Sequence, residues 1–136
     1  MESKYVLNAR ALRAKGYNCA QAVACAFIDE VPVDEKTLFA IMEGFGGGMG
    51  GKDATCGAVS GAVAIASLLS SKGDVASGTK AATYALASSM VSSFLGQNQS
   101  LVCKTLLGKE NGVVLRDCEL CIEDAVRLAE SVLNLK

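Results

Sequence analysis

Six cysteines and no histidine define the chemistry open to this chain of 136 residues. Without histidine, a Ser–His–Asp or Cys–His mechanism is excluded, and so is any imidazole-ligated metal. The chemistry that remains belongs to the thiols, which exchange disulfides or, as thiolates, ligate zinc and iron–sulfur clusters. Five of the cysteines lie beside glycines or at expected helix starts: Cys19, Cys56, Cys103, Cys118 and Cys121.

Four of these cysteines follow residues that are typical helix caps. The pairs of cap and cysteine are Asn18 with Cys19, Thr55 with Cys56, Ser100 with Cys103, and Asp117 with Cys118. The first turn of a helix carries unpaired N–H groups and the positive end of the helix dipole. Both favour a thiolate and lower its pKa below the ordinary ~8.5. The four thiols are therefore predicted to form a reactive or metal-ligating cluster, provided that the helix starts converge.

The other cysteine signals are weaker. Cys25 lies in the middle of an expected helix, where a thiol usually packs as a small hydrophobic group. Cys118 and Cys121 form a C-x-x-C pair, but the chain lacks the βαβ pattern of a thioredoxin-like site and the second C-x-x-C of a zinc ribbon. No histidine follows Cys121, which excludes a c-type haem site. We expect Cys25 to be packing, whereas Cys118 and Cys121, which share one helix face at i and i+3, could form a disulfide or chelate one metal.

The elements that position these thiols are predicted to be helices. Apolar residues make up 51% of the chain and aromatic residues 5%, and valine and isoleucine do not alternate with polar residues as in strands. We predict an all-α, single-domain bundle over residues 1–136. It would hold six or seven helices, at about residues 3–15, 19–31, 35–43, 54–70, 77–95, 100–108 and 117–133.

Two of these helices carry a prediction about burial. The segment 54–70 is apolar all round, so we expect it to be the buried central helix of the bundle. The helix at 77–95 is expected to turn an apolar face inward, formed by Ala82, Ala85, Leu86, Met90, Val91 and Phe94.

A glycine-rich segment precedes the central helix. Its G-x-G-x-x-G match over residues 46–51 follows a helical pattern rather than a strand, and Asp53 replaces the Ser or Thr of a P-loop, so nucleotide binding is disfavoured. We expect instead a tightly turned loop whose backbone approaches Cys56 and covers the cysteine cluster, the alternative being a plain helix connector. The glycines expected to lie closest to a bound cofactor are Gly48, Gly50 and Gly57.

Several segments jointly resemble one known family. They are NCAQAV at 18–23, GFGGGMG at 44–50, CGAVSG at 56–61, CKTLLG at 103–108, and a cysteine at 118 six residues before Asp124-Ala125. Over residues 15–133 the chain resembles the redox-active protein family named for the pattern C…GCAxxG…C…C. The resemblance implies that the family cysteines are Cys19, Cys56, Cys103 and Cys118, and that Cys25 and Cys121 are additional.

Three functions remain open from the sequence. In the first, the chain exchanges disulfides with an unidentified redox partner protein, like a thiol–disulfide oxidoreductase, with Cys56 as the attacking thiolate and Cys19, Cys103 or Cys118 resolving. In the second, the same four thiolates hold an iron–sulfur cluster or zinc in an electron-transfer or sensing module. In the third, the chain is a non-catalytic helical interaction protein whose cysteines only pack.

The composition and net charge of the chain indicate which classes of partner and which cellular location to expect. A net charge of −1 provides no electrostatic footprint for nucleic acid or an anionic membrane. The longest apolar stretch, residues 54–69, contains Thr, Ser and Gly and falls short of the roughly 18 residues of a membrane span. The first residues lack the order of a signal peptide. We expect a cytoplasmic protein with reduced thiols, for which a homodimer is plausible.

Overall fold

A computed structural model describes residues 2–135, which form helices and no strands. Six longer helices are α1 (Lys4–Ala14), α2 (Cys19–Cys25), α3 (Glu35–Met42), α5 (Gly57–Ser70), α6 (Lys80–Asn98) and α8 (Cys118–Leu133). The short elements are α4 (Gly46–Met49), α7 (Cys103–Leu106) and two 3₁₀ turns, Ile28–Glu30 and Glu43–Phe45. The predicted all-α class is confirmed, and the seven predicted segments correspond to every described α-helix except α4.

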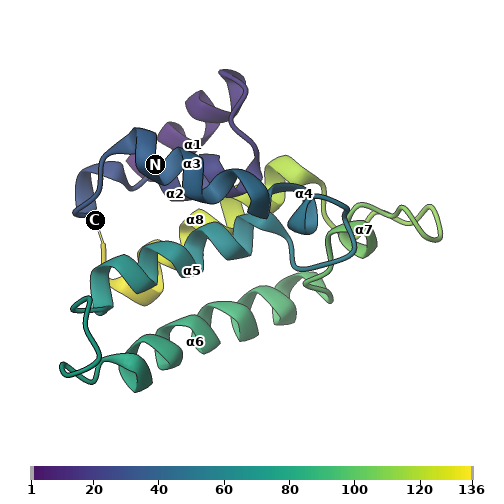
Figure 1. Ribbon diagram of the computed structural model, residues 1–136. Coiled ribbons are helices and arrows are strands. Elements are labelled where there is room, and N and C mark those ends of the chain that lie inside the picture. Colours follow the sequence, from purple (N-terminus) through teal and green to yellow (C-terminus); the bar gives the residue numbers. More distant parts are fainter. Residues whose placement is uncertain (1, 136) are drawn as a thin grey trace.

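Helix α5 is the centre of the bundle (Figure 1). It packs against α2, α6 and α8. Small residues allow α2 to come close, since a Cβ added to Gly61 would lie 2.7 Å from the carbonyl oxygen of Ala20. The predicted buried central helix is therefore confirmed, but it begins at Gly57 rather than near residue 54.

Polar caps set the starts of four helices, as the sequence predicts. Asn18 accepts a hydrogen bond from the backbone N–H of Gln21, whose side chain bonds back to the N–H of Asn18, a complete capping box at the start of α2. Ser3, Asp34 and Asp117 cap α1, α3 and α8. The predicted cap at Ser100 is wrong, because its hydroxyl accepts from the N–H of Val102 one residue before α7 begins.

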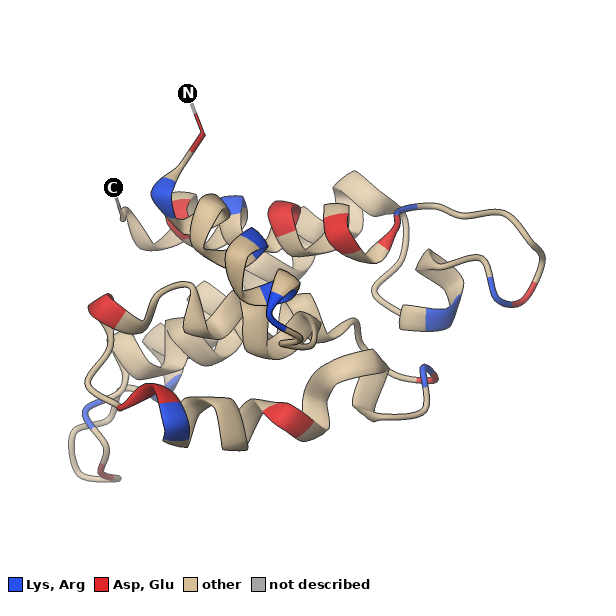
Figure 2. Cartoon of the chain, turned by 90° about the horizontal axis from the view of Figure 1, so that it is seen from above, with Lys and Arg blue, Asp and Glu red and all other residues tan. Residues whose placement is uncertain are grey.

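Charged side chains of both signs are interspersed over the helices (Figure 2). The longest run of ion pairs joins the two ends of the sequence, where Arg10 and Arg127 both pair with Glu2 and Glu123. These ion pairs link α1 to α8 at the surface of the bundle. No helix in residues 2–135 is long and apolar enough to cross a membrane.

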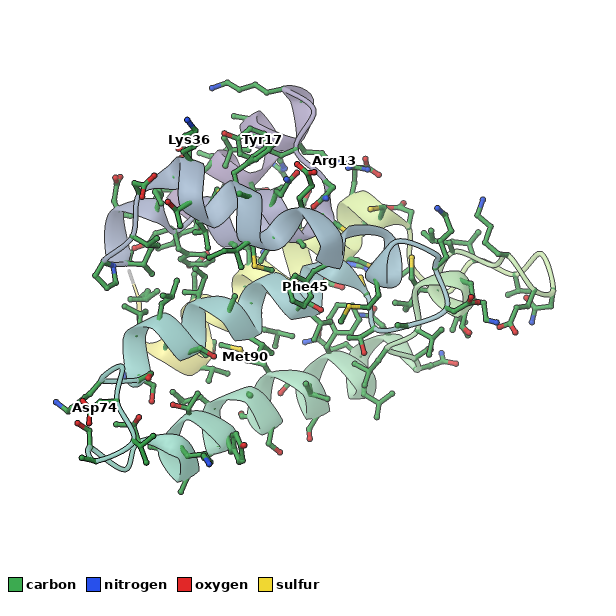
Figure 3. The ribbon with its side chains drawn as sticks, in the orientation of Figure 1. Arg13, Tyr17, Lys36, Phe45, Asp74 and Met90 are labelled. Carbon is green, nitrogen blue, oxygen red and sulfur yellow. The ribbon has the colours of Figure 1, made fainter. Side chains whose placement is uncertain are left out.

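Helix α6 is the least enclosed of the long helices. Its buried residues are Met90, Phe94 and Asn98, four positions apart along one line, and Figure 3 shows Met90 pointing from α6 toward α5. The predicted inner face is wrong for Ala82 and Ala85, which are exposed. The buried residues of α6 lie in its second half. In the first half, alanines occur on every side of the helix, so the sequence does not show which face is apolar.

The starts of α5 and α8 lie at the same end of the bundle as α4 and α7 (Figure 1). The loop between α5 and α6 lies at the opposite end. Because a helix start concentrates unpaired N–H groups, the end at which α5 and α8 begin is where anionic groups such as thiolates are stabilised.

Candidate active site

A cavity of about 300 Å³ lies at this end of the bundle. Five cysteines line it, and so do Arg13, Asn18, Gly47, Lys52, Leu106 and Leu107. The cysteines are Cys19, Cys56, Cys103, Cys118 and Cys121. The structure therefore brings together the four cysteines proposed from the sequence and adds Cys121 to them.

The helix starts present these thiols to the cavity. Cys19, Cys103 and Cys118 are the first residues of α2, α7 and α8. Cys56 is the N-cap of α5, one position earlier than the predicted first turn. Cys121 lies one turn along α8 from Cys118, so both face the same side of that helix.

The glycine-rich segment passes so close to the thiols that side chains would not fit. A Cβ on Gly57 would lie 2.5 Å from the Sγ of Cys19, and one on Gly48 would lie 2.6 Å from the Cβ of Cys103. Within the glycine-rich loop, Gly48 thus packs against Cys103, whereas Gly57, the first residue of α5, packs against Cys19 and against the loop backbone at Phe45 and Gly46. Gly50 differs, because a Cβ there would meet nothing within 4 Å; it has a left-handed φ of 87° where α4 ends.

Cys19 and Cys118 both line the cavity, and each influences the pKa of the other. The S–H of Cys118 is the largest influence lowering the pKa of Cys19 to about 6. The backbone N–H of Gly47, 3.5 Å from the Cys19 Sγ, and the positive charge of Arg13 act in the same direction and together outweigh burial. Donation to Cys19, followed by burial, raises the pKa of Cys118. These directions favour a thiolate at Cys19 over one at Cys118.

Cys56 and Cys121 also line the cavity and influence each other's pKa in the same way. Hydrogen bonding to Cys121 is the largest influence lowering the pKa of Cys56, helped by backbone N–H groups of Ala58 and Val59 in the first turn of α5 and opposed by burial and by the nearby charge of Cys19. The pKa of Cys121 is raised, first by that hydrogen bond and then by burial. The Cys121 thiol donates to the carbonyl oxygen of Arg116, which lies 3.7 Å from its Sγ.

The remaining two cysteines have no such partner. Cys103 lines the cavity, and burial, then the charges of Cys56 and Cys19, raise its pKa. Cys25 lies outside the cavity lining in the buried core, where burial raises its pKa to about 11. This position agrees with the expectation that Cys25 packs as a small hydrophobic residue.

Among the lining residues that carry a thiol or a charge, Cys121, Arg13 and Lys52 are not site residues predicted from the sequence. The spacing of Cys121 from Cys118, which places both on one face of a helix, is the signal that could include it. Arg13 donates to the Sγ of Cys118 from Nη2 at 3.6 Å, and Lys52 lines the cavity. Arg13 belongs to no motif, and Lys52 ends a P-loop-like stretch that is disfavoured as a nucleotide site, so the local sequence does not predict either cation at a thiol cavity.

The four predicted metal ligands were also compared with the demands of a metal site. No group of three or more cysteine, aspartate or glutamate side chains within residues 2–135 is arranged to hold a metal ion. Binding of zinc or an iron–sulfur cluster therefore stays a prediction from the sequence, and no step below involves either.

The chain matches the family model described as "Putative redox-active protein (C_GCAxxG_C_C)" over residues 17–132. All five cysteines that line the cavity fall within this match. No curated protein and no solved structure matches the chain.

Proposed function

The chain belongs to the C_GCAxxG_C_C family of redox-active, cysteine-containing proteins, and from this membership we propose that it exchanges disulfides through its cavity thiols. One observation carries the proposal. Five cysteines line one cavity, and among them the pKa is lowered at Cys19 and Cys56 and raised at Cys118 and Cys121. A stabilised thiolate beside a second thiol is the arrangement that attack and resolution of a disulfide require.

The first pair, Cys19 and Cys118, is the proposed exchange site. The Cys19 thiolate attacks one sulfur of a partner disulfide, the partner S–S bond breaks, and one partner sulfur leaves as a thiolate. Cys118 then loses its proton to solvent and attacks the Cys19 sulfur of the mixed disulfide. The second partner sulfur leaves, so the partner gains two electrons and two thiols while the protein gains a Cys19–Cys118 disulfide. A partner dithiol reverses the same steps.

Cys19 is preferred here to Cys56 as the attacking group. Arg13 and Gly47 both stabilise a Cys19 thiolate, whereas the charge of Cys19 opposes ionisation of Cys56. Access does not distinguish the two candidates, because Cys19 and Cys56 are each 5% accessible, whereas the resolving thiol, Cys118, is half-buried. We assign Cys56 and Cys121 to a second pair that can hold two more electrons.

Disulfide mapping tests the proposal. Reduced protein is treated with a mild disulfide oxidant, its free thiols are blocked with iodoacetamide, and its peptides are analysed by mass spectrometry. We expect Cys19–Cys118 and Cys56–Cys121 disulfides that dithiothreitol reverses. The Cys19→Ser and Cys118→Ser variants should lose exchange with a small test disulfide.

Cys25→Ser is the matched control, because Cys25 is buried but lies outside the cavity lining. It should keep both disulfides and the exchange activity. Six thiols that remain free after oxidation would overturn the proposed function. Disulfides that join Cys25 or scramble among all six cysteines would overturn the pairing.

A further inference from the structure

The charges around the cavity bear on which molecules reach its thiols. Two cations line the cavity, Arg13 and Lys52, and no aspartate or glutamate is among its lining residues. Elsewhere the two signs of charge are interspersed (Figure 2). A small molecule that enters the cavity therefore meets a local excess of positive side chains that the net charge of −1 does not reveal.

Arg13 is held against the thiols by several bonds. Its Nη2 donates to the Sγ of Cys118 at 3.6 Å, and its Nη1 donates to the carbonyl oxygen of Tyr17 at 3.2 Å. Its Nε lies 3.3 Å from Glu119, whose side chain is 65% exposed. Because that carboxylate is well solvated, it offsets the arginine charge only in part.

Lys52 supplies the second cation. None of the ion pairs among residues 2–135 involves it, whereas the neighbouring Lys104 pairs with Asp53 and Glu110. The Lys52 backbone is fixed by bonds to Gly47 and Lys104, of 2.7 and 2.9 Å. Its φ of 67° is a left-handed conformation that glycine adopts without strain. The chain thus keeps a long cationic side chain at a position where glycine would be easier to accommodate.

The redox state changes the balance of charge in the cavity. In the reduced protein, the pKa values of Cys19 and Cys56 are lowered, so a thiolate at either position offsets positive charge in the cavity. When the proposed disulfides form, no cavity thiolate remains at these positions, whereas Arg13 and Lys52 still line the cavity. The attraction for an anion is therefore greatest in the oxidised protein, which is the form that a reducing thiol meets.

We propose that the oxidised protein is reduced by a low-molecular-weight thiol that carries a carboxylate or another anionic group. This inference rests on the proposed disulfide exchange. A cavity of about 300 Å³ is at the small end of ligand sites, which suits a small molecule. The thiolate of the first molecule attacks Cys118, the Cys19–Cys118 bond breaks, and a second molecule releases Cys118. The small-molecule disulfide leaves, and the protein has gained two electrons.

Three thiols of matched length and different charge provide the test: 2-mercaptoethanesulfonate, 2-mercaptoethanol and cysteamine. The oxidised protein is mixed with each at low ionic strength, and the loss of the Cys19–Cys118 disulfide is followed by alkylation and mass spectrometry. Each rate is divided by the thiolate concentration of that reagent. We expect the sulfonate to react fastest and the amine slowest, with roughly a tenfold span that narrows in salt.

Charge variants show whether Lys52 is responsible for the selectivity. Lys52→Gln should reduce the ratio of the sulfonate rate to the amine rate, and Lys52→Glu should reduce it further. Lys72→Gln is the matched control, because Lys72 lies in the loop between α5 and α6 at the opposite end of the bundle, close to Asp74 in the sequence (Figure 3). It should leave the ratio unchanged.

The outcomes separate the two proposals. Equal rates per thiolate for the three reagents, or a ratio that Lys52→Glu leaves unchanged, would overturn the anionic reductant while disulfide exchange stands. A protein that forms no reducible Cys19–Cys118 disulfide would overturn the proposed function, and the anionic reductant with it.

Discussion

The pKa values of single thiols set the pH range over which the cavity reacts. Cys19 should be alkylated by iodoacetamide with a midpoint near pH 6, because Cys118, Gly47 and Arg13 stabilise its thiolate. Cys118→Ala removes the largest of these influences, so the midpoint should rise toward the ordinary ~8.5. The measurement is the pH dependence of modification of the Cys19 peptide by mass spectrometry. A wild-type midpoint already near the ordinary value would contradict the assignment of Cys19 as the thiolate.

The same lowered pKa predicts how stability changes with pH. A thiol whose pKa is lower in the folded protein contributes stability that is fully present above its unfolded pKa and is lost as pH falls through its folded pKa. For Cys19 this window runs from about 6 up to the unfolded value of ~8.5. Urea unfolding should therefore show stability rising with pH across this window. In Cys19→Ala the rise should be shallower, and an identical slope in both proteins would count against the folded-state pKa.

At the scale of elements, close helix packing explains where glycine is required. Gly57→Ala should destabilise the protein by about 1–3 kcal/mol, the usual cost of overpacking, because its Cβ would lie 2.5 Å from the Cys19 Sγ and 2.8 Å from the carbonyl oxygen of Phe45. Gly96→Ala is the control: a Cβ there meets nothing within 4 Å, and alanine in a helix should add about 0.5–1 kcal/mol. Thermal unfolding measures both, and a tolerated Gly57→Ala would contradict this packing.

The cap of α8 carries a prediction of its own. The Asp117 carboxylate accepts from the N–H of Leu120 at 2.9 Å and so fixes the first turn that contains Cys118 and Cys121. Asp117→Ala should cost about 1 kcal/mol, whereas Asp117→Asn keeps an accepting oxygen and should cost less. Urea unfolding provides the comparison. Equal losses for the two variants would show that the side-chain cap is not what stabilises this helix start.

Local signals explain which parts of the fold could be predicted. Caps such as Asn18 and Asp117 act on their own helices, so the sequence locates those helix starts within a residue or two. The faces of α6 and the start of α5 depend on which neighbours pack there, and the sequence misplaces both.

The candidate site, too, could be predicted from the sequence only in part. The family motifs identify four of the five cavity cysteines, because each motif is contiguous in the chain. The pairing of Cys19 with Cys118 and of Cys56 with Cys121 depends on how α2, α5 and α8 come together, and so does the approach of Arg13 and Lys52. No local pattern contains that tertiary information.

On the scale of the whole molecule, oxidation should stabilise the fold. A Cys19–Cys118 disulfide would join residues 99 positions apart; typical disulfides contribute about 2–4 kcal/mol, and long loops tend toward the upper end. Urea unfolding of the oxidised and reduced protein measures the difference. Lower stability in the oxidised form would mean that the bundle must distort to form this bond.

The separation of the thiols along the chain also has a consequence for biosynthesis. Cys19 lies in α2, Cys56 begins α5, and both of their partners lie in α8, the last of these helices to leave the ribosome. Until α8 docks, neither thiol pair exists, and the nascent chain carries only separate cysteines of ordinary reactivity. Redox competence would then arise in a single step with completion of the bundle, and a stalled or misfolded chain would be unable to draw electrons from the cellular thiol pool through this site.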